Sequence, residues 1–451
     1  MKQILPPRKG LSAICGPQKK KDLPYRLTTH CVQLSCPDGV LFYQTLTGEL
    51  ILLENGETVE AQRDELIRRR FLVPQDFDEQ RYLSQVRQLL SVMAKKKTGF
   101  SRFLIFTTMD CNARCYYCYE LGRARPVMSA DTARETAAYI IRNRAEGDVN
   151  LQWFGGEPLF NRPVIDLITG ALRENNVPFT SGMVSNGYLF DEDTVHTAVE
   201  RWNLKKVQIT LDGTEEIYNR SKAYIYRDGS PYRRVLHNIG LLREAGVHVM
   251  IRLNIGRDNV EDLLVLCEEL KERFPDRKNL SVYAALLKDF GNVKMSLGEE
   301  EQRLTAYTDL YRRLNVLGLY SARLTNQELK LNHCMADSDE SIGILPDGRL
   351  TKCEHVTEND LVGTLSGPLP TAEACAPWRE RVSVPECRAC AHAPLCQDLK
   401  KCAGTEGTCT TLDRAVKDIH LLHSIRNTYE KEKNKAPITV SDNTEDDAEL
   451  C

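Results

Sequence analysis

The sequence predicts an α/β protein in which parallel strands form a partial or full barrel with helices outside. Two observations support this class. Six short apolar runs read as buried strands: Phe103–Thr107, Asn150–Phe154, Phe179–Ser185, Lys206–Leu211, His248–Asn254 and Leu280–Leu286. Amphipathic stretches separate them: Ser129–Glu146, Arg162–Asn175, Asp191–Trp202, Arg233–Ala245 and Asn259–Phe274. Strands that alternate with helices in this way are typical of parallel βαβ units.

Local signals agree with these elements. Ser129 is a residue type that often precedes a helix, and Gly246 is one that often follows a helix end. In a parallel sheet the ligand sites lie at the carboxyl ends of the strands. We therefore look for functional residues directly after each strand.

The segment before the barrel, residues 1–95, is expected to form a small domain. It contains two strand-like runs, Cys31–Ser35 and Val40–Tyr43, on either side of the turn Pro37–Gly39. A polar helix at about Glu60–Arg70 follows, and Lys95–Gly99 reads as a linker.

The segments after the barrel differ in composition. We expect the barrel region, residues 100–317, to end with a helix at about Leu297–Leu317, before a cysteine-rich domain over residues 331–412. A last helix covers residues 413–432. Residues 433–451 are rich in Asp and Glu and are predicted to be a disordered tail.

Composition narrows the functional classes. A chain of 451 residues is longer than a domain with a single hydrophobic core usually is. The net charge is −3, from 60 basic and 63 acidic side chains. Such a balance gives no basic field for nucleic acid or anionic membranes. We see no secretory signal at the N-terminus and no apolar run of the roughly 20 residues that span a bilayer. A cytoplasmic protein without nucleic-acid or membrane partners is expected.

The sixteen cysteines are unusual for that compartment. Cytosolic thiols are kept reduced, so a high cysteine content indicates metal or redox chemistry. Three cysteines lie within residues 111–118, and eight lie between residues 334 and 409.

The first group is Cys111-x3-Cys115-x2-Cys118, directly after the first strand. Three thiolates on one tight loop can hold three irons of a four-iron cubane and leave the fourth iron open. The alternative is zinc, which normally takes four ligands in a closed site. No fourth ligand is near in sequence, since His196 and His237 follow other elements.

This spacing after a β-strand is similar to the signature of the radical SAM superfamily, named after S-adenosylmethionine (SAM). The resemblance implies a partial (β/α)6 barrel, a [4Fe–4S] cluster on Cys111, Cys115 and Cys118, and reductive cleavage of SAM to a 5′-deoxyadenosyl radical. It also implies SAM contacts at successive strand ends. The expected residues are Tyr117 in the loop, Gly155, Gly156 and Glu157, Ser185 and Asn186, Asp212, and Arg252 with Asn254.

The physical chemistry of those residues suits the assignment. Two glycines allow close backbone approach, and carbonyls or Glu157 can accept from the SAM ammonium. Arg252 can bind a carboxylate through its two-pronged guanidinium. Taken singly, the Gly155–Pro158 motif is equally compatible with a tight turn. No residue is assigned as a catalytic acid or base, although Asp212 and Tyr119 lie in the right region.

The second cysteine group resembles the SPASM extension of radical SAM enzymes, which implies two auxiliary [4Fe–4S] clusters and three clusters in all. One would be held by Cys334, Cys353 and Cys402, the other by Cys387, Cys390, Cys396 and Cys409.

This group also departs from the family pattern. Five residues separate Cys396 from Cys402, where the family usually has three. Either Cys375 completes the first auxiliary cluster or an open iron there can bind a substrate thiolate. Zinc knuckles are the alternative for Cys387-x2-Cys390. The other cysteines have no metal spacing: Cys15, Cys31, Cys36, Cys267 and Cys451.

Residues 1–95 are similar to the winged-helix-like modules that bind leader peptides in maturases of ribosomally made peptides. An exposed strand edge can take such a leader as an added strand; the alternative is a capping domain. The resemblance implies a precursor peptide as partner and a flavodoxin or ferredoxin as electron donor. Thioether crosslinking, as in sactipeptide and ranthipeptide maturases, is favoured over carbon–carbon crosslinking, epimerisation and formylglycine formation as in anaerobic sulfatase activators.

Two hypotheses from other classes stay open at this point. One is an iron–sulfur electron carrier or scaffold, which would not need Glu157, Asn186 or Arg252 at strand ends. The other is a zinc protein that binds nucleic acid, which the near-neutral charge disfavours.

Overall fold

The computed structural model describes residues 1–8, 24–93, 98–256, 259–287, 300–320, 322–324, 329, 334–355, 360–396, 399–402 and 409–434. The chain divides into two compact units. The first comprises residues 1–77, 322–329 and 419–451, and the second comprises residues 78–321 and 330–418. The predicted linker lysines 95–97 and the acidic tail from residue 435 lie outside the described residues. No helix of the described residues has the length and apolarity to cross a bilayer.

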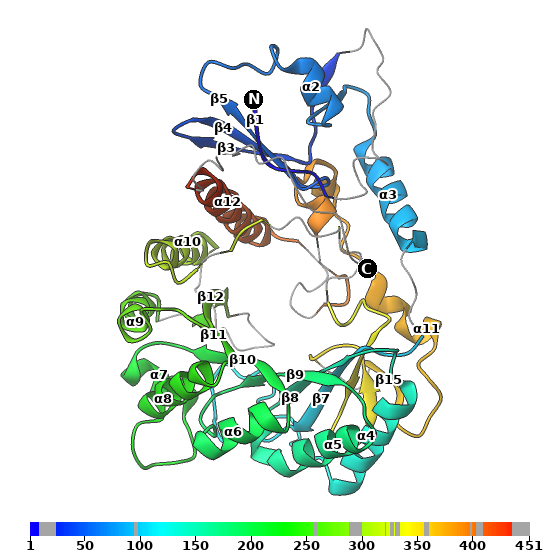
Figure 1. Cartoon of the computed structure of the whole chain (residues 1–451), viewed down its shortest axis with the longest axis vertical. Coiled ribbons are helices and arrows are strands. Elements are labelled where there is room, and N and C mark those ends of the chain that lie inside the picture. Colours follow the sequence, from blue (N-terminus) through cyan, green and yellow to red (C-terminus); the bar gives the residue numbers. More distant parts are fainter. Residues whose placement is uncertain are drawn as a thin grey trace, which may run out of the picture. The chain divides into compact units, whose positions relative to one another are not determined.

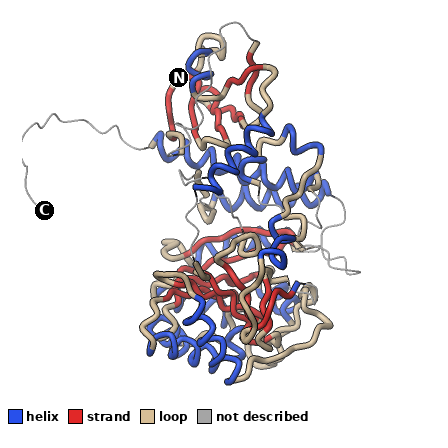
Figure 2. The backbone as a smooth tube through the Cα atoms, turned by 90° about the vertical axis from the view of Figure 1, so that its right-hand side faces the viewer, coloured by secondary structure: helices blue, strands red, loops and turns tan. Residues whose placement is uncertain are grey.

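The second unit is built on six parallel strands that pair in chain order, which confirms the predicted α/β barrel class. Each of the six predicted runs forms one strand, extended by at most two residues at either end. The strands are β7 (Arg102–Thr108), β8 (Val149–Gly155), β9 (Phe179–Ser185), β10 (Leu204–Leu211), β11 (His248–Ile255) and β12 (Leu280–Leu286). Figure 1 shows helices along the outer side of this row of strands, and Figure 2 shows the same layering from a second direction.

The helices between the strands also lie where the amphipathic pattern predicts them. Ser129 caps α4 by accepting from the Thr132 N–H at 3.0 Å, as its residue type suggests. The helices are α4 (Ala130–Asn143), α5 (Arg162–Glu174), α6 (Glu192–Glu200), α7 (Glu215–Lys222), α8 (Pro231–Glu244), α9 (Val260–Arg273) and α10 (Glu300–Val316). Their apolar faces pack on strand residues such as Ile105, Trp153 and Ile251, which are fully buried.

The sheet continues beyond the barrel strands into the cysteine-rich segment. Strand β13 (Ser341–Ile344) pairs in parallel with β7, from Ser341 opposite Arg102 to Ile344 opposite Ile105. Strands β14 (Arg349–Thr351) and β15 (Leu361–Thr364) follow with antiparallel pairing. Strands of three or four residues carry too little periodic signal to be read from sequence.

Helix α3 (Glu79–Met93) belongs to this second unit. Its Gln80 amide donates to the Cys387 carbonyl at 3.0 Å, and its Arg87 guanidinium donates to the Ala393 carbonyl at 2.6 Å. The N-terminal segment of the first compact unit therefore ends at residue 77, whereas the expected domain boundary is at residue 95.

The first unit contains a four-stranded antiparallel sheet in the order β1-β5-β4-β3. Its strands are β1 (Lys2–Leu5), β3 (Cys31–Cys36), β4 (Gly39–Gln44) and β5 (Glu49–Glu54). The predicted turn at Pro37–Gly39 joins β3 to β4. The predicted helix at residues 60–70 is shorter, as α2 (Arg63–Arg68), and a small sheet pairs β2 (Tyr25–Leu27) with β6 (Leu72–Pro74).

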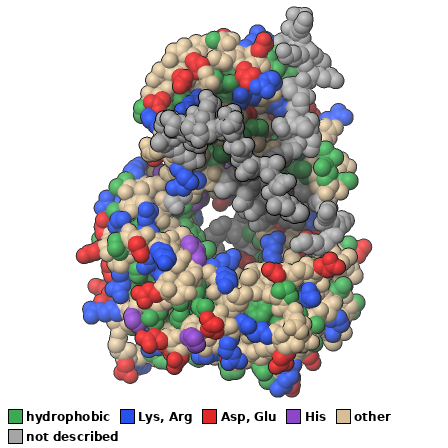
Figure 3. Space-filling view, viewed as in Figure 1, with side chains coloured by type: hydrophobic (Ala, Val, Ile, Leu, Met, Phe, Trp, Pro, Cys, Tyr) green, Lys and Arg blue, Asp and Glu red, His purple; other side chains and the backbone are tan. Residues whose placement is uncertain are grey.

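One side of the four-stranded sheet has an apolar core. Leu41, Leu50 and Leu52 pack with Ile425 and Tyr429 from the C-terminal part of α12 (Thr411–Lys433). This helix is the one predicted for residues 413–432. On the face of the molecule in Figure 3, acidic and basic side chains are interspersed, in keeping with the small net charge.

Candidate active site at the strand ends

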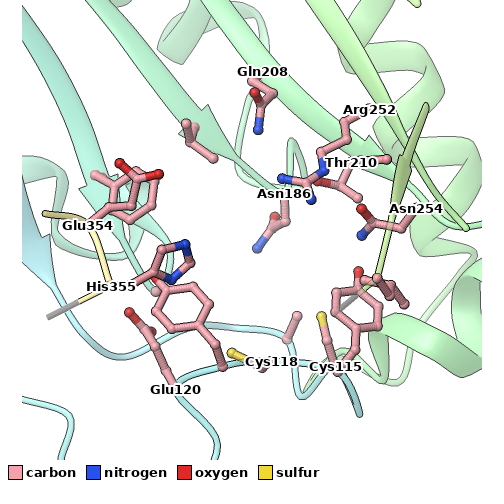
Figure 4. A pocket seen from close by; sticks show the side chains of 18 of the residues that line it. Cys115, Cys118, Glu120, Asn186, Gln208, Thr210, Arg252, Asn254, Glu354 and His355 are labelled. Carbon is pink, nitrogen blue, oxygen red and sulfur yellow. The ribbon is translucent and has the colours of Figure 1, made fainter. Parts of the chain in front are cut away.

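The three cysteines of the first group line one cavity of about 760 Å³ in the second unit. They follow β7, and the Cys118 N–H donates to the Cys115 carbonyl at 3.2 Å, which folds the loop into a turn. Figure 4 shows Cys115 and Cys118 at the floor of the cavity. Burial raises the pKa of Cys111 to about 12.

The described residues contain no group of three His, Cys, Asp or Glu side chains placed to bind a single metal ion. A cubane cluster does not require such convergence, because each of its cysteines binds a different iron. The three thiols of one loop line a common cavity, as the cysteines of such a cluster would.

Backbone hydrogen bonds hold the glycine-containing end of β8 against the start of the cysteine loop. The Gly156 N–H donates to the Thr108 carbonyl at 3.0 Å, and the Glu157 N–H donates to the Asp110 carbonyl at 3.0 Å. A Cβ on Gly155 would lie 2.0 Å from the Thr108 oxygen, and Gly155 has a φ of +120°. Both glycines line the cavity. Because they have no side chain, the end of β8 can also lie directly against the backbone of residues 108–110.

The carboxylate of Glu157 lies outside the cavity lining and is fully buried. It accepts from the Ser185 hydroxyl at 2.9 Å, the Asn186 N–H at 2.8 Å and the Leu159 N–H at 3.2 Å. Both oxygens are thus occupied by the protein, and the side chain fastens the end of β8 to the end of β9. Of the two acceptor types expected in this motif, the Glu157 carboxylate is therefore engaged within the protein.

Glu157 gives a testable pH dependence. Burial raises its pKa from 4.5 to about 7, although the three donors oppose the shift. Folding therefore takes up a proton, so this contribution to stability is present below pH 4.5 and is lost as the pH rises through 7. We expect the ionisation of Glu157 to lower the free energy of unfolding of the metal-free protein by about 3 kcal/mol as the pH rises from below 4.5 to above 7.

The matching variant is Glu157→Gln, which cannot ionise. Denaturant unfolding at several pH values should show a shallower fall in the variant than in the wild type. Burial also raises the pKa of Glu120 to about 7, but Glu120 is present in both proteins and cancels in the comparison. Equal slopes would show that Glu157 does not change its charge on folding.

Strand β11 supplies Arg252 and Asn254, which both line the cavity. The Arg252 Nε and the Asn254 Oδ1 are buried without a hydrogen-bond partner. Buried polar atoms of this kind are costly unless a ligand satisfies them. In Figure 4 both side chains point into the cavity beside Asn186, whose Nδ2 donates to the Asn112 Oδ1 at 2.6 Å.

Gln208 and Thr210 on β10 also line the cavity and were not singled out by the sequence analysis. Thr210 lies beside Arg252 in the parallel register of β10 and β11. The signal was available, because polar residues two positions apart in an apolar strand share one face.

Asp212 is almost fully buried and does not line the cavity. It accepts from the Tyr117 hydroxyl at 2.6 Å and from the Asn254 Nδ2 at 3.0 Å. Its third partner is the Lys222 ammonium, at 3.2 Å. The sequence analysis missed Lys222, because nothing in the polar helix α7 indicates that this lysine is buried.

A second wall of the cavity is formed by Tyr119, Glu120, Glu354 and His355. Glu120 follows Cys118 closely, and Glu354 and His355 directly follow Cys353. The rings of Tyr119 and His355 meet edge to face with centroids 4.8 Å apart. Figure 4 shows Glu120, Glu354 and His355 across the cavity from Arg252. One cavity thus extends from the first cysteine loop to the neighbours of Cys353.

Two cysteines of the second group share one apolar cluster. Cys353 packs with Trp378 and Leu399, and Cys402 packs against the same cluster. Burial raises the pKa of Cys353 to about 12. Cys353 and Cys402, with Cys334, are the residues expected to hold the first auxiliary cluster, and that assignment stays a prediction.

The remaining cysteines are distributed as follows. Cys387, Cys390 and Cys396 lie in or beside two short 3₁₀ turns, Pro385–Ala389 and Ala393–Leu395, which α3 contacts. The other expected members are Cys409, just before α12, and Cys375, which ends α11 (Ala372–Cys375). Cys267 is buried in α9, Cys31 and Cys36 lie on β3, and Cys15 and Cys451 are outside the described residues.

The comparisons with known proteins agree with the geometry. The model of the radical SAM superfamily matches residues 105–270. An Fe-coproporphyrin III synthase of Methanosarcina barkeri is 26% identical over 229 residues, 50% of this chain and 54% of the relative. An AdoMet-dependent heme synthase of Nitratidesulfovibrio vulgaris is 24% identical over 166 residues, 36% of this chain and 43% of the relative. The chain spans about half the length of the curated relatives it matches.

Two solved structures share the fold. The native anSMEcpe structure with bound AdoMet (SAM) aligns with a TM-score of 0.57 at 16% identity, over 74% of this chain and 100% of the other. Streptococcus suis SuiB bound to precursor peptide SuiA aligns with a TM-score of 0.50 at 13% identity, over 83% and 95%. The matched region, residues 105–270, contains the cysteine loop and the ends of five strands that surround the cavity. Residues 105–270 therefore form a domain that matches the radical SAM superfamily.

Proposed function

We propose that this protein is a radical SAM maturase that modifies a ribosomally made precursor peptide in the cytoplasm, with thioether crosslinking as the favoured reaction. The observation that carries the proposal is the shared cavity, which is lined both by Cys111, Cys115 and Cys118 and by the neighbours of Cys353. A substrate in this cavity would lie between the first cysteine loop and the segment that follows Cys353.

The residues present fit a cluster and SAM. Three thiols on one loop suit the cluster, and the unpartnered Arg252 Nε and Asn254 Oδ1 suit a carboxylate and a hydroxyl or ammonium of SAM. The backbone of Gly155, Gly156 and Tyr117 lines the remaining contact surface. When bound, the reduced cluster and SAM supply a 5′-deoxyadenosyl radical that abstracts a hydrogen atom from the substrate.

The protein's own part is to hold the reactants and exclude water. Arg252 and Asn254 are held in place because their backbone belongs to the end of β11. Asn186 holds the cysteine loop through its hydrogen bond to Asn112. The apolar segment Ala284–Leu287 lines the cavity as well. A shielded site protects a radical from side reactions.

We further propose two auxiliary clusters, on Cys334, Cys353 and Cys402 and on Cys387, Cys390, Cys396 and Cys409, with a flavodoxin or ferredoxin as electron donor. An open iron near Cys353 would bind a substrate thiolate, which is why thioether formation is favoured. The packing of Cys402 against the apolar cluster that contains Cys353 supports the first assignment.

The first unit is proposed to bind the leader of the precursor. Strand β3 is an edge of its four-stranded sheet as described, and its residues are only partly buried. An edge strand can pair with an extended peptide. The precursor peptide in the solved structure of SuiB is in keeping with such a partner.

Co-expression with a short cysteine-containing precursor encoded nearby tests the reaction. Each crosslink removes two hydrogens, which intact mass detects, and a thioether also protects one cysteine from alkylation. Loss of two hydrogens with all thiols still alkylatable indicates carbon–carbon crosslinking. Formylglycine formation from cysteine would remove sulfur, and an unchanged mass leaves epimerisation or inactivity. A purified protein that makes no 5′-deoxyadenosine from SAM and dithionite would instead be an electron carrier.

Arg252 provides a test of SAM binding. We expect Arg252→Gln to raise the Kd for SAM about 10- to 100-fold, because a charged hydrogen bond contributes about 1.5–3 kcal/mol. Calorimetry on the reconstituted protein measures this Kd. The control is Arg134→Gln on α4, which is exposed and does not line the cavity. Equal affinities for both variants would remove Arg252 from the SAM site.

A further inference from the structure

The segment that follows α7 is fastened to the cysteine loop at two backbone positions. The Arg114 N–H donates to the Lys222 carbonyl at 2.8 Å, and the Ile225 N–H donates to the Asn112 carbonyl at 2.9 Å. Between them Ala223 takes a left-handed conformation, with a φ of 45°, which turns the chain back toward the loop. The loop between Cys111 and Cys115 therefore rests on this segment.

The side chain of Lys222 makes a further contact with the cysteine loop, at Tyr117. Its Nζ lies 2.7 Å from the Tyr117 hydroxyl and 3.2 Å from the Asp212 carboxylate, and only 4% of the residue is exposed. The ammonium also lies 5.4 Å from the centre of the Tyr117 ring and 5.8 Å from that of Tyr218. Partners on several sides hold this charge in one position.

The ammonium lies close to the cysteine loop. Lys222 lines the same cavity as Cys111, Cys115 and Cys118. Tyr117, whose hydroxyl the ammonium contacts, lies between Cys115 and Cys118 in the sequence. A fixed positive charge therefore stands beside the loop.

We propose that Lys222 is a positioning residue whose buried ammonium raises the reduction potential of the cluster held by Cys111, Cys115 and Cys118. The inference rests on the proposed function of that site. Adding an electron makes the cluster more negative, and a fixed positive charge in a poorly solvated surrounding stabilises the added electron. Asp212 holds the ammonium in place and partly cancels its field, so the pair sets the potential through the balance of two charges.

A series of charge variants tests this mechanism. Lys222→Met keeps the length of the side chain and removes the charge. Lys222→Arg keeps the charge, and Tyr117→Phe removes a hydrogen bond without changing any charge. Asp212→Asn leaves the ammonium without its counter-charge, and the double variant Lys222→Met with Asp212→Asn restores a neutral pair.

The readout is the midpoint potential of the cluster that Cys115→Ala abolishes, measured by redox titration with electron paramagnetic resonance and without SAM or peptide. At the wild-type midpoint we expect the ratio of reduced to oxidised cluster to be about tenfold lower in Lys222→Met, a shift of about 59 mV for one electron. Asp212→Asn should shift in the opposite direction. Lys222→Arg, Tyr117→Phe and the double variant should lie near the wild type.

Iron content separates the possible failures. If the wild type binds no iron after anaerobic reconstitution, the proposed function fails and this inference with it. If the wild type binds the cluster and neither Lys222→Met nor Asp212→Asn shifts the potential, only the inference is overturned. If Lys222→Met does not retain the cluster, Asp212→Asn still decides, because a potential equal to the wild type contradicts the proposal.

Discussion

Replacing Cys115 by Ala will remove the SAM-binding cluster and abolish 5′-deoxyadenosine formation. Cys115 is the middle thiol of a loop that presents three thiols to one cavity. A cubane with only two protein ligands is poorly held, and no other cysteine of the described residues lines the cavity to replace the third. The expected loss is complete rather than partial, because SAM cleavage requires the cluster.

The measurement is iron and sulfide per chain after anaerobic reconstitution, with 5′-deoxyadenosine quantified by chromatography. Iron should fall by about four atoms per chain and should not fall to zero if auxiliary clusters are present. Cys36→Ala on β3 is the control, since this cysteine lies in the first unit, and it should leave both quantities unchanged. A Cys115→Ala protein that still produces 5′-deoxyadenosine contradicts the assignment of the loop.

Gly155→Ala will disrupt the site without touching a metal ligand or a SAM-facing side chain. The added Cβ would lie 2.0 Å from the Thr108 carbonyl oxygen, on a residue whose φ is +120°. A side chain at such a φ costs about 1–2 kcal/mol, and overpacking against fixed backbone costs about 1–3 kcal/mol more. We expect a destabilisation of about 2–5 kcal/mol and a cluster content well below that of the wild type.

Gly170 on α5 provides a matched control for this substitution. A Cβ there would meet nothing within 4 Å, and an alanine inside a helix is favoured over glycine by about 0.5–1 kcal/mol. Gly170→Ala should therefore be slightly more stable than the wild type in denaturant unfolding. If Gly155→Ala unfolds at the same denaturant concentration as Gly170→Ala, the close backbone contact does not exist in solution.

The barrel was predictable because its elements are defined by local periodicity. Runs such as Phe179–Ser185 are apolar, short and separated by amphipathic helices, so their type and order follow from the sequence. Strands β13 to β15 are too short for such a signal and exist only through pairing with β7 and with one another.

Much of the candidate site was predictable for a topological reason. Parallel strands bring their carboxyl ends to one edge, so Asn186 and Arg252 meet at one cavity although 66 residues separate them in the sequence numbering. The direction of each side chain was not predictable. Glu157 faces the end of β9, and Lys222 is buried below Tyr117, because tertiary contacts decide both.

The pairing of β13 with β7 has a consequence for shortened forms of the protein. Strand β7 is apolar and buried after its first residue, and it is hydrogen-bonded to β8 on one side and to Ser341–Ile344 on the other. A chain that stops before residue 341 would expose a hydrophobic strand with unsatisfied amide and carbonyl groups. Such edges template intermolecular sheets, so the truncated barrel would self-associate and precipitate.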